Sequence, residues 1–93
     1  MKKNAYIINV SRGSVVDEKA LLQCLKNKMI KGAALDVYEE EPKINPLFKK
    51  LNNVILHPHH GSGTFETRKS MSELSILNLK NFFKTREPLH KVI

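Results

Sequence analysis

The 93-residue sequence lacks any apolar run long enough to span a membrane, and no apolar signal segment follows the charges of Lys2 and Lys3. It contains one cysteine, so no disulfide can form within the chain. Because Cys24 falls between Leu21 and Leu25 on an expected helix face, we expect it to be a small buried residue in a reducing compartment. These absences predict a cytoplasmic protein without membrane contact.

Aromatic residues are scarce, at 6% of the chain, and tryptophan is absent. The net charge of +7 suits an acidic partner, but the basic residues are spread out and lack the interleaved aromatic side chains that stack on bases. We therefore expect a solvated basic surface and no nucleic-acid partner. The length allows one domain at most, with a modest core.

Three short apolar segments are typical of strands, at 5–10, 30–37 and 54–56. The segment 54–56 is wholly apolar, which predicts a strand covered on both faces. Between the first two segments, Asp17 is a candidate N-cap, and apolar residues at helical spacing follow it. This order of strand, helix and strand predicts a right-handed βαβ unit.

The second half of the sequence is expected to carry one long helix at 64–84, with Thr64 as its N-cap. The apolar residues of this helix cover more than one stripe, which predicts burial between two bodies. A short helical turn is expected at 47–51, and the end of the chain at 89–93 has strand character.

Polar residues follow each expected strand: Arg12 the first, Asp36 and Glu41 the second, and His59 the third. The carboxyl ends of parallel strands share one edge of a sheet, and ligands of open α/β sheets bind there. A guanidinium at this edge suits a carboxylate through two parallel hydrogen bonds. The sequence therefore predicts a ligand site that recognises an acid.

These residues also have ordinary structural interpretations. Arg12 could be a surface arginine, since charged residues are mostly exposed, and Asp36 could be a loop cap. His57, His59 and His60 are spaced closely enough to chelate a metal, but the sequence shows no further ligand nearby. We therefore expect no metal site.

Several motifs follow one another over roughly the first 72 residues, and together they are far more specific than any one of them. They are Asn-Val-Ser-Arg-Gly at 9–13, Val-Asp-Glu at 16–18, Gly-Ala-Ala-Leu-Asp-Val-Tyr at 32–38, Glu-Pro at 41–42 and Pro-His at 58–59 with Gly61. In this order they resemble the second half of the cofactor domain of the D-isomer-specific 2-hydroxyacid dehydrogenases.

The resemblance implies an α/β fold, a partial Rossmann-like, doubly wound parallel sheet of about three strands with flanking helices and a long C-terminal helix. It implies that residues 1–63 are the C-terminal part of a dinucleotide-binding domain, and that residues 64–93 are a helix and tail returning to the substrate domain. The implied cofactor is NAD or NADP. The implied substrate is a small 2-oxo or 2-hydroxy acid, and 58–68 leans towards the glyoxylate and hydroxypyruvate reductase branch.

The resemblance also implies a role for each polar residue. Arg12 would bind the substrate carboxylate and polarise the carbonyl, and His59 would be the general acid in reduction and the base in the reverse reaction. Glu41 would orient His59 and favour its protonated form. Asp36 would hydrogen-bond the nicotinamide carboxamide. The implied cofactor contacts are Val10, Ser11, Arg12, Asp36, His59 and Gly61.

The fingerprint G-x-G-x-x-G, which cradles a dinucleotide pyrophosphate, does not occur in the sequence. Gly61 and Gly63 do not form it, because Glu66 stands where its third glycine would be. We therefore expect a fragment of an oxidoreductase that is inactive by itself, or one half of a split enzyme. The rival hypothesis is a non-catalytic interaction module. The expected macromolecular partner is a complementary N-terminal half or a second copy of the chain.

Three further positions carry expectations. Lys28 stands where the family usually has a helix-ending glycine, and a non-glycine residue in a left-handed cap costs about 1 kcal/mol. His57 stands where threonine is common, which alters the polarity near His59. The first strand begins the sheet and has an unprotected edge, so we expect the chain to be dimeric, domain-swapped or aggregation-prone, and Ile7→Lys to shift it towards unfolding or monomer.

Overall fold

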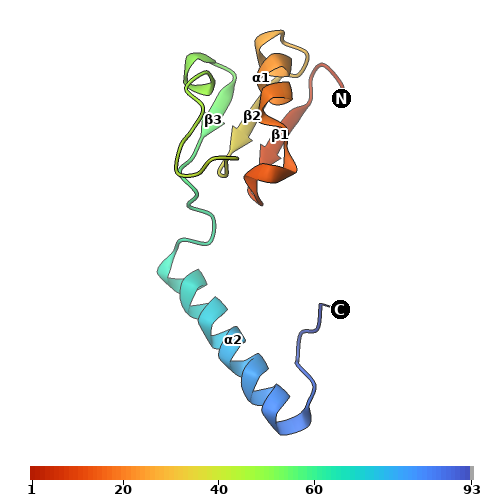
Figure 1. Ribbon diagram of the computed structural model, residues 1–93, viewed down its shortest axis with the longest axis vertical. Coiled ribbons are helices and arrows are strands. Elements are labelled where there is room, and N and C mark those ends of the chain that lie inside the picture. Colours follow the sequence, from red (N-terminus) through yellow and green to blue (C-terminus); the bar gives the residue numbers. More distant parts are fainter. Residues whose placement is uncertain (93) are drawn as a thin grey trace. The chain divides into compact units, whose positions relative to one another are not determined.

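The computed structural model describes residues 1–92, and its strands form one parallel sheet in the order β1-β2-β3 (Figure 1). The elements are β1 (Tyr6–Asn9), η1 (Gly13–Val15), α1 (Glu18–Lys26), β2 (Gly32–Leu35), η2 (Phe48–Lys50), β3 (Val54–Leu56) and α2 (Phe65–Thr85). This three-stranded parallel α/β arrangement with a long C-terminal helix confirms the predicted fold class. The predicted turn near residue 48 is the 3-10 helix η2.

The chain divides into two compact units, one ending at Gly61 and the other starting at Ser62. The first unit contains the sheet and α1, and the second contains α2. Within residues 1–92, neither helix combines the length and the apolar character that crossing a membrane requires.

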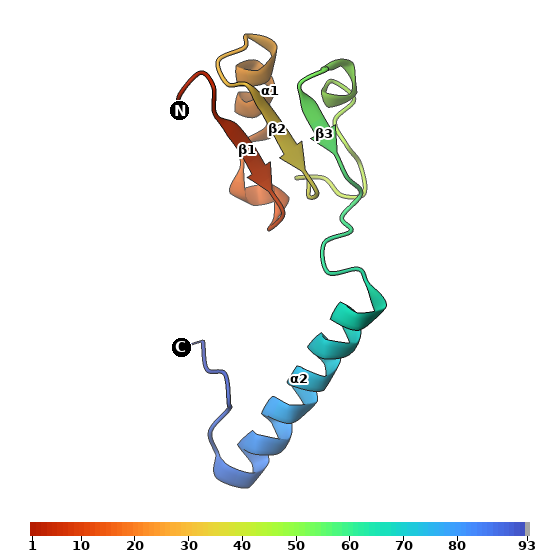
Figure 2. The same cartoon turned by 180° about the vertical axis from the view of Figure 1, so that it is seen from behind.

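One face of the sheet is covered by α1, as the two opposite views in Figures 1 and 2 show. The helix begins as predicted, since the Asp17 carboxylate accepts a hydrogen bond of 3.0 Å from the Ala20 backbone N–H. Its buried stripe joins strand and loop residues in one core cluster, which consists of Leu21, Leu25, Ile30, Ala33, Leu35, Tyr38 and Phe48. Cys24 packs against this cluster as a partly buried residue, so it is less buried than expected.

The opposite face of the sheet is not covered by any helix of the first unit, and its isoleucine side chains are exposed. Ile8, Ala34 and Ile55 lie in register across the three strands, and Ile8 is 71% exposed. The prediction that 54–56 is covered on both faces is therefore wrong for this chain. Ile7 points to the other face, where it packs against the core, so Ile8 is the position at which a charge would meet the open face.

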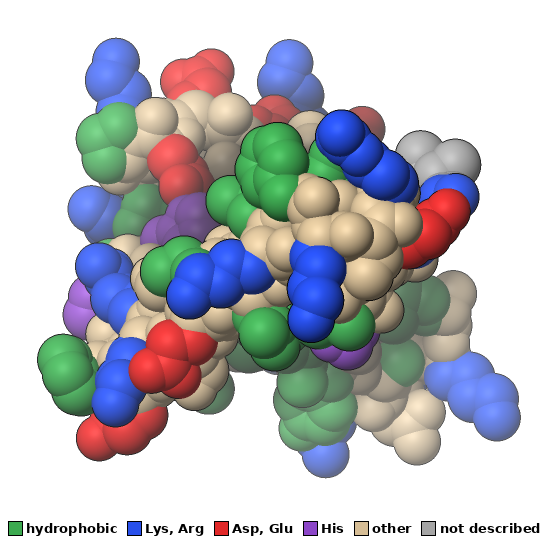
Figure 3. Space-filling view, turned by 90° about the horizontal axis from the view of Figure 1, so that it is seen from below, with side chains coloured by type: hydrophobic (Ala, Val, Ile, Leu, Met, Phe, Trp, Pro, Cys, Tyr) green, Lys and Arg blue, Asp and Glu red, His purple; other side chains and the backbone are tan. Residues whose placement is uncertain are grey.

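In the second unit, α2 begins as predicted, with the Thr64 side chain accepting a hydrogen bond from the Thr67 backbone N–H. None of its residues is buried. Exposed hydrophobic side chains lie among lysine and arginine side chains on the surface drawn in Figure 3. The strand character expected at 89–93 does not lead to a strand at residues 89–92, and Ile93 lies outside the described residues.

Lys28, just after α1, has the predicted left-handed backbone, with φ of 53°. We expect Lys28→Gly to stabilise the chain by about 1 kcal/mol, because glycine adopts this φ without a Cβ clash. The matched control is Lys26→Gly, which removes the same exposed charge inside α1 and should destabilise by about 1 kcal/mol. Urea denaturation followed by tyrosine fluorescence measures both. A loss of stability in Lys28→Gly would contradict the prediction.

Candidate active site

The turn after β1 carries Arg12 and is shaped by Asn9, the last residue of the strand. Asn9 is buried, and its side chain donates a hydrogen bond of 3.0 Å to the Arg12 carbonyl oxygen. Its Oδ1 accepts hydrogen bonds from the Ser11 backbone N–H at 3.2 Å and from the Ser11 hydroxyl at 2.9 Å. Arg12 is exposed, and its Nη1 donates to the Ser11 carbonyl oxygen. This role of Asn9 was not predicted from the sequence.

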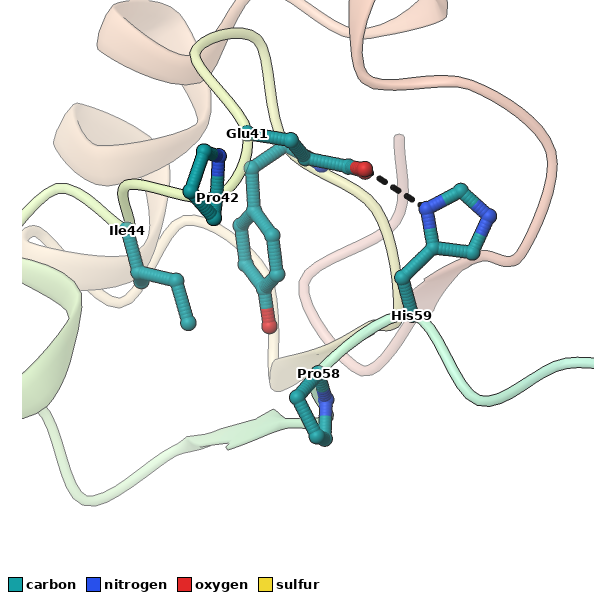
Figure 4. Close-up of a pocket in the computed structure, with 6 residues that line it drawn as sticks. Glu41, Pro42, Ile44, Pro58 and His59 are labelled. Atoms are coloured by element: carbon teal, nitrogen blue, oxygen red, sulfur yellow. Dashed lines mark hydrogen bonds and ion pairs between the residues drawn. The ribbon is translucent and has the colours of Figure 1, made fainter. Parts of the chain in front are cut away.

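The loop after β3 brings His59 to the loop after β2, where Glu41 lies. The Nδ1 atom of His59 is 2.6 Å from Oε2 of Glu41, and the second ring nitrogen points away from Glu41 (Figure 4). The other oxygen of Glu41 accepts a 3.1 Å hydrogen bond from the Tyr38 backbone N–H. The hydrogen bond from His59 and then that from Tyr38 lower the pKa of Glu41, and the charge of Arg12 adds to this effect. Glu41 is therefore an ionised partner that fixes the orientation of the imidazole.

Asp36 follows β2 directly, and its carboxylate accepts hydrogen bonds from the loop after β3. Its Oδ1 accepts a 2.8 Å hydrogen bond from the His60 backbone N–H and lies 3.1 Å from Nδ1 of His57. Its Oδ2 accepts a 2.7 Å hydrogen bond from the Gly61 backbone N–H. These bonds, with the His60 N–H first, lower the pKa of Asp36 to about 2 although burial opposes the shift. The side chain remains charged at neutral pH.

Tyr38 links the ends of β2 and β3, which was not predicted from the sequence. Its hydroxyl accepts a 3.0 Å hydrogen bond from the His57 backbone N–H and lies 2.7 Å from the His57 carbonyl oxygen. The side chain is buried, and this burial raises the pKa of the phenol, so it stays neutral. The tyrosine in the Asp-Val-Tyr motif was the available signal.

The turn with Arg12 also packs tightly against the loop with Glu41. Gly13 is buried, and a Cβ built on it would lie 2.0 Å from the Tyr38 carbonyl carbon. Glu18 and Glu39 complete the contact, since each backbone N–H donates to the carboxylate of the other residue, at 3.3 and 2.8 Å. Arg12, Glu41 and His59 are thus gathered at one edge of the sheet.

A shallow pocket of about 400 Å³ adjoins the pair of His59 and Glu41 (Figure 4). Its other lining residues are mostly apolar: Tyr38, Pro42, Ile44 and Pro58. Within residues 1–92, no group of three or more histidine, cysteine or acidic side chains is arranged to hold a metal ion. By its chemistry, the Arg12 guanidinium is suited to bind a carboxylate at this edge, and the His59 imidazole is suited to transfer a proton.

The expected cofactor contacts have different surroundings. Val10 and Ser11 are exposed beside Arg12, so they are accessible to a ligand. Gly61 and Asp36 are hydrogen-bonded to each other, so the carboxylate is partly used inside the protein. The prediction used only the residues that follow each strand. The hydrogen bonds of Asp36 to the backbone of the loop after β3 were not predicted.

Comparisons with known proteins give the family of the chain. Residues 1–61 match the family described as D-isomer specific 2-hydroxyacid dehydrogenase, NAD binding domain. A Staphylococcus aureus protein named as a 2-hydroxyacid dehydrogenase is 60% identical over 74 residues, which are 80% of this chain and 23% of that protein. The chain therefore spans about 23% of the length of this relative.

Solved structures similar to this chain include a reductase and a dehydrogenase that act on such acids by name. The NADPH-dependent glyoxylate/hydroxypyruvate reductase of Sinorhizobium meliloti, in complex with NADP and malonate, has a TM-score of 0.84 and 46% identity, over 97% of this chain and 28% of its own. A 2-hydroxyacid dehydrogenase from Ketogulonicigenium vulgare has a TM-score of 0.79 and 44% identity, over 99% of this chain and 29% of its own.

Proposed function

The chain belongs to the D-isomer specific 2-hydroxyacid dehydrogenase family, and we propose that it supplies the carboxylate-binding and proton-transfer residues for reduction of a small 2-oxo acid. The observation that carries this proposal is the 2.6 Å contact between Nδ1 of His59 and Oε2 of Glu41, at the same sheet edge as Arg12. Glyoxylate and hydroxypyruvate are the proposed substrates, because the S. meliloti enzyme is named for them.

The proton would pass through His59. With Nδ1 held by Glu41, the proton on Nε2 is available to the carbonyl oxygen of the substrate. Glu41 stays ionised because its pKa is lowered, so it stabilises the imidazolium before transfer without taking the proton itself. In the reverse reaction, Nε2 accepts the hydroxyl proton of the 2-hydroxy acid.

Substrate orientation would come from Arg12. A guanidinium can donate two parallel hydrogen bonds to a carboxylate, which fixes the acid group and leaves the adjacent carbonyl beside His59. Arg12 is exposed and its charge acts on Glu41, so it lies on the same side of the site.

A nicotinamide cofactor, NAD or NADP, would supply the hydride when bound. The residues fit its nicotinamide end, since ionised Asp36 can accept from a carboxamide and the backbone around Val10 and Ser11 is exposed. The sequence has no glycine-rich motif for the pyrophosphate. We propose that this part of the cofactor site comes from a complementary N-terminal half.

A graft tests the proposal. The chain replaces the matching 28% of the S. meliloti reductase, and NADPH oxidation is followed with glyoxylate. We expect turnover by the graft and none by the 93-residue chain. A folded graft that binds NADPH but does not reduce glyoxylate would show that Arg12 and His59 do not have the proposed roles.

The open sheet face favours a second candidate function, association with another chain. We expect the isolated chain to self-associate through this face, and Ile8→Lys to shift it towards monomer, because an ammonium group there would be buried in the interface. Light scattering coupled to size exclusion at about 100 µM measures the shift. Val15→Lys is the control, since Val15 is equally exposed but lies outside the sheet. A monomeric wild-type chain at that concentration would refute the prediction.

A further inference from the structure

We propose that Asp36 is a positioning residue for His59, whose loop it holds by both of its carboxylate oxygens. This role is separate from a contact with the nicotinamide. Its value for catalysis rests on the proposed function of His59, whereas the positioning itself does not.

The hydrogen bonds of Asp36 reach residues on both sides of His59. Before it, the ring of His57 lies 3.1 Å from Oδ1; after it, the backbone N–H groups of His60 and Gly61 donate at 2.8 and 2.7 Å. Asp36 is 7% exposed, so this buried carboxylate depends on these donors. The end of β2 is thereby fastened to the segment that carries His59.

The backbone of that segment needs such support. His59 has φ of 56° and Ser62 has φ of 58°, a left-handed conformation that is unfavourable for residues with a Cβ. Strained conformations of this kind persist where neighbouring contacts fix them. The bonds from Asp36 to His60 and Gly61 fix the backbone immediately after His59.

Gly61 provides an independent observation. A Cβ built on Gly61 would lie 2.9 Å from Oδ2 of Asp36, closer than such atoms approach in proteins. A side chain at this position would therefore displace the Asp36 carboxylate or shift the loop backbone. This approach brings the Gly61 N–H within 2.7 Å of Oδ2.

Asp36 and Glu41 therefore act on different parts of the same residue. Glu41 contacts the ring of His59, and Asp36 holds the backbone beside it. The low pKa of Asp36, about 2, keeps this support ionised at neutral pH.

The test follows the Glu41 carboxyl carbon by NMR during a pH titration of the 93-residue chain, with Asp36→Asn and the control Asp17→Asn. The hydrogen bond from His59 is the first cause of the low Glu41 pKa, so a displaced His59 should raise that pKa towards its ordinary value. Removal of a negative charge by itself would lower it instead. Asp17→Asn makes the same charge change and preserves an N-cap, so it should not raise the Glu41 pKa.

A rise of the Glu41 pKa in Asp36→Asn supports the proposal, and an unchanged or lower value in the folded variant overturns it. Gly61→Ala is the second variant, because it retains the charge of Asp36 but pushes Oδ2 away. It should also raise the Glu41 pKa. If Asp36→Asn fails to fold, the result of Gly61→Ala decides in the same way.

The grafted reductase adds a kinetic readout. Gly61→Ala there should lower kcat about tenfold, since small displacements of a proton donor are costly. An inactive wild-type graft would count against the proposed function, while the Glu41 titration would still decide whether Asp36 positions His59.

Discussion

His59→Ala in the grafted reductase should lower kcat for glyoxylate reduction on the order of 10²-fold or more, the usual loss when a general acid is removed. Alanine leaves the carbonyl oxygen without a positioned proton donor, since Nε2 of His59, whose ring contacts Glu41, is the proposed donor. Stopped-flow or steady-state absorbance of NADPH measures the rate. His59 is 43% exposed, so its truncation should leave the fold intact.

The adjacent histidine provides the matched control. The ring of His60 contacts that of His57 edge-on, 5.2 Å between centroids, and only its backbone N–H reaches Asp36. His60→Ala keeps that N–H, so we expect a rate close to that of the unmutated graft. Full activity of His59→Ala, or an equal loss in both variants, would refute the assignment of His59 as the proton donor.

Features that depend on a few neighbouring residues were predictable from the sequence. Both helices begin after the predicted N-caps, because the side chains of Asp17 and Thr64 accept hydrogen bonds from N–H groups three residues later. The third strand has the predicted bounds, since its apolar run ends at the residue before His57.

The buried face of each strand was not predictable. β3 is wholly apolar, and β1 is apolar up to Asn9, which is itself buried, so neither strand has exposed polar residues that mark its solvent side. The choice between Ile7 and Ile8 therefore depended on α1, which covers the Ile7 side. The exposure of the other face of the sheet likewise could not be predicted from β3, because the residues of this strand are all apolar.

The sequence allowed us to predict which residues of the candidate site follow the strands. It did not allow us to predict most of the hydrogen bonds between them. Parallel strands place Arg12, Glu41 and His59 at one edge whatever the loop paths are. The contacts of Asp36 and Tyr38 depend on how the loop after β3 folds back, and they join residues 19 to 25 positions apart. Side-chain to backbone bonds over such distances follow from tertiary structure and leave no local pattern.

Gly13→Ala should destabilise the first unit by about 3 kcal/mol, at the upper end of the range for overpacking. The added Cβ would lie 2.0 Å from the carbonyl carbon of Tyr38 and 2.1 Å from its oxygen, and backbone atoms cannot rotate away as a side chain can. Position 13 needs glycine because a Cβ has no space there. Backbone conformation is not the reason, since no glycine among residues 1–92 has a positive φ. Relief of the clash moves η1 away from the loop after β2 and breaks the paired bonds of Glu18 and Glu39.

The loss is large for a unit of this size, because small domains are stable by roughly 0.05–0.15 kcal/mol per residue. Urea denaturation followed by tyrosine fluorescence measures it, with buried Tyr38 reporting on the contact that is strained. Ser14→Ala is the control: Ser14 is the next residue in η1 and is exposed, so the free energy of unfolding should change by less than about 0.5 kcal/mol. Equal stabilities of the two variants would mean that η1 adapts without losing its packing on Tyr38. In that case, the tight approach of Gly13 would not be what holds Arg12 beside Glu41.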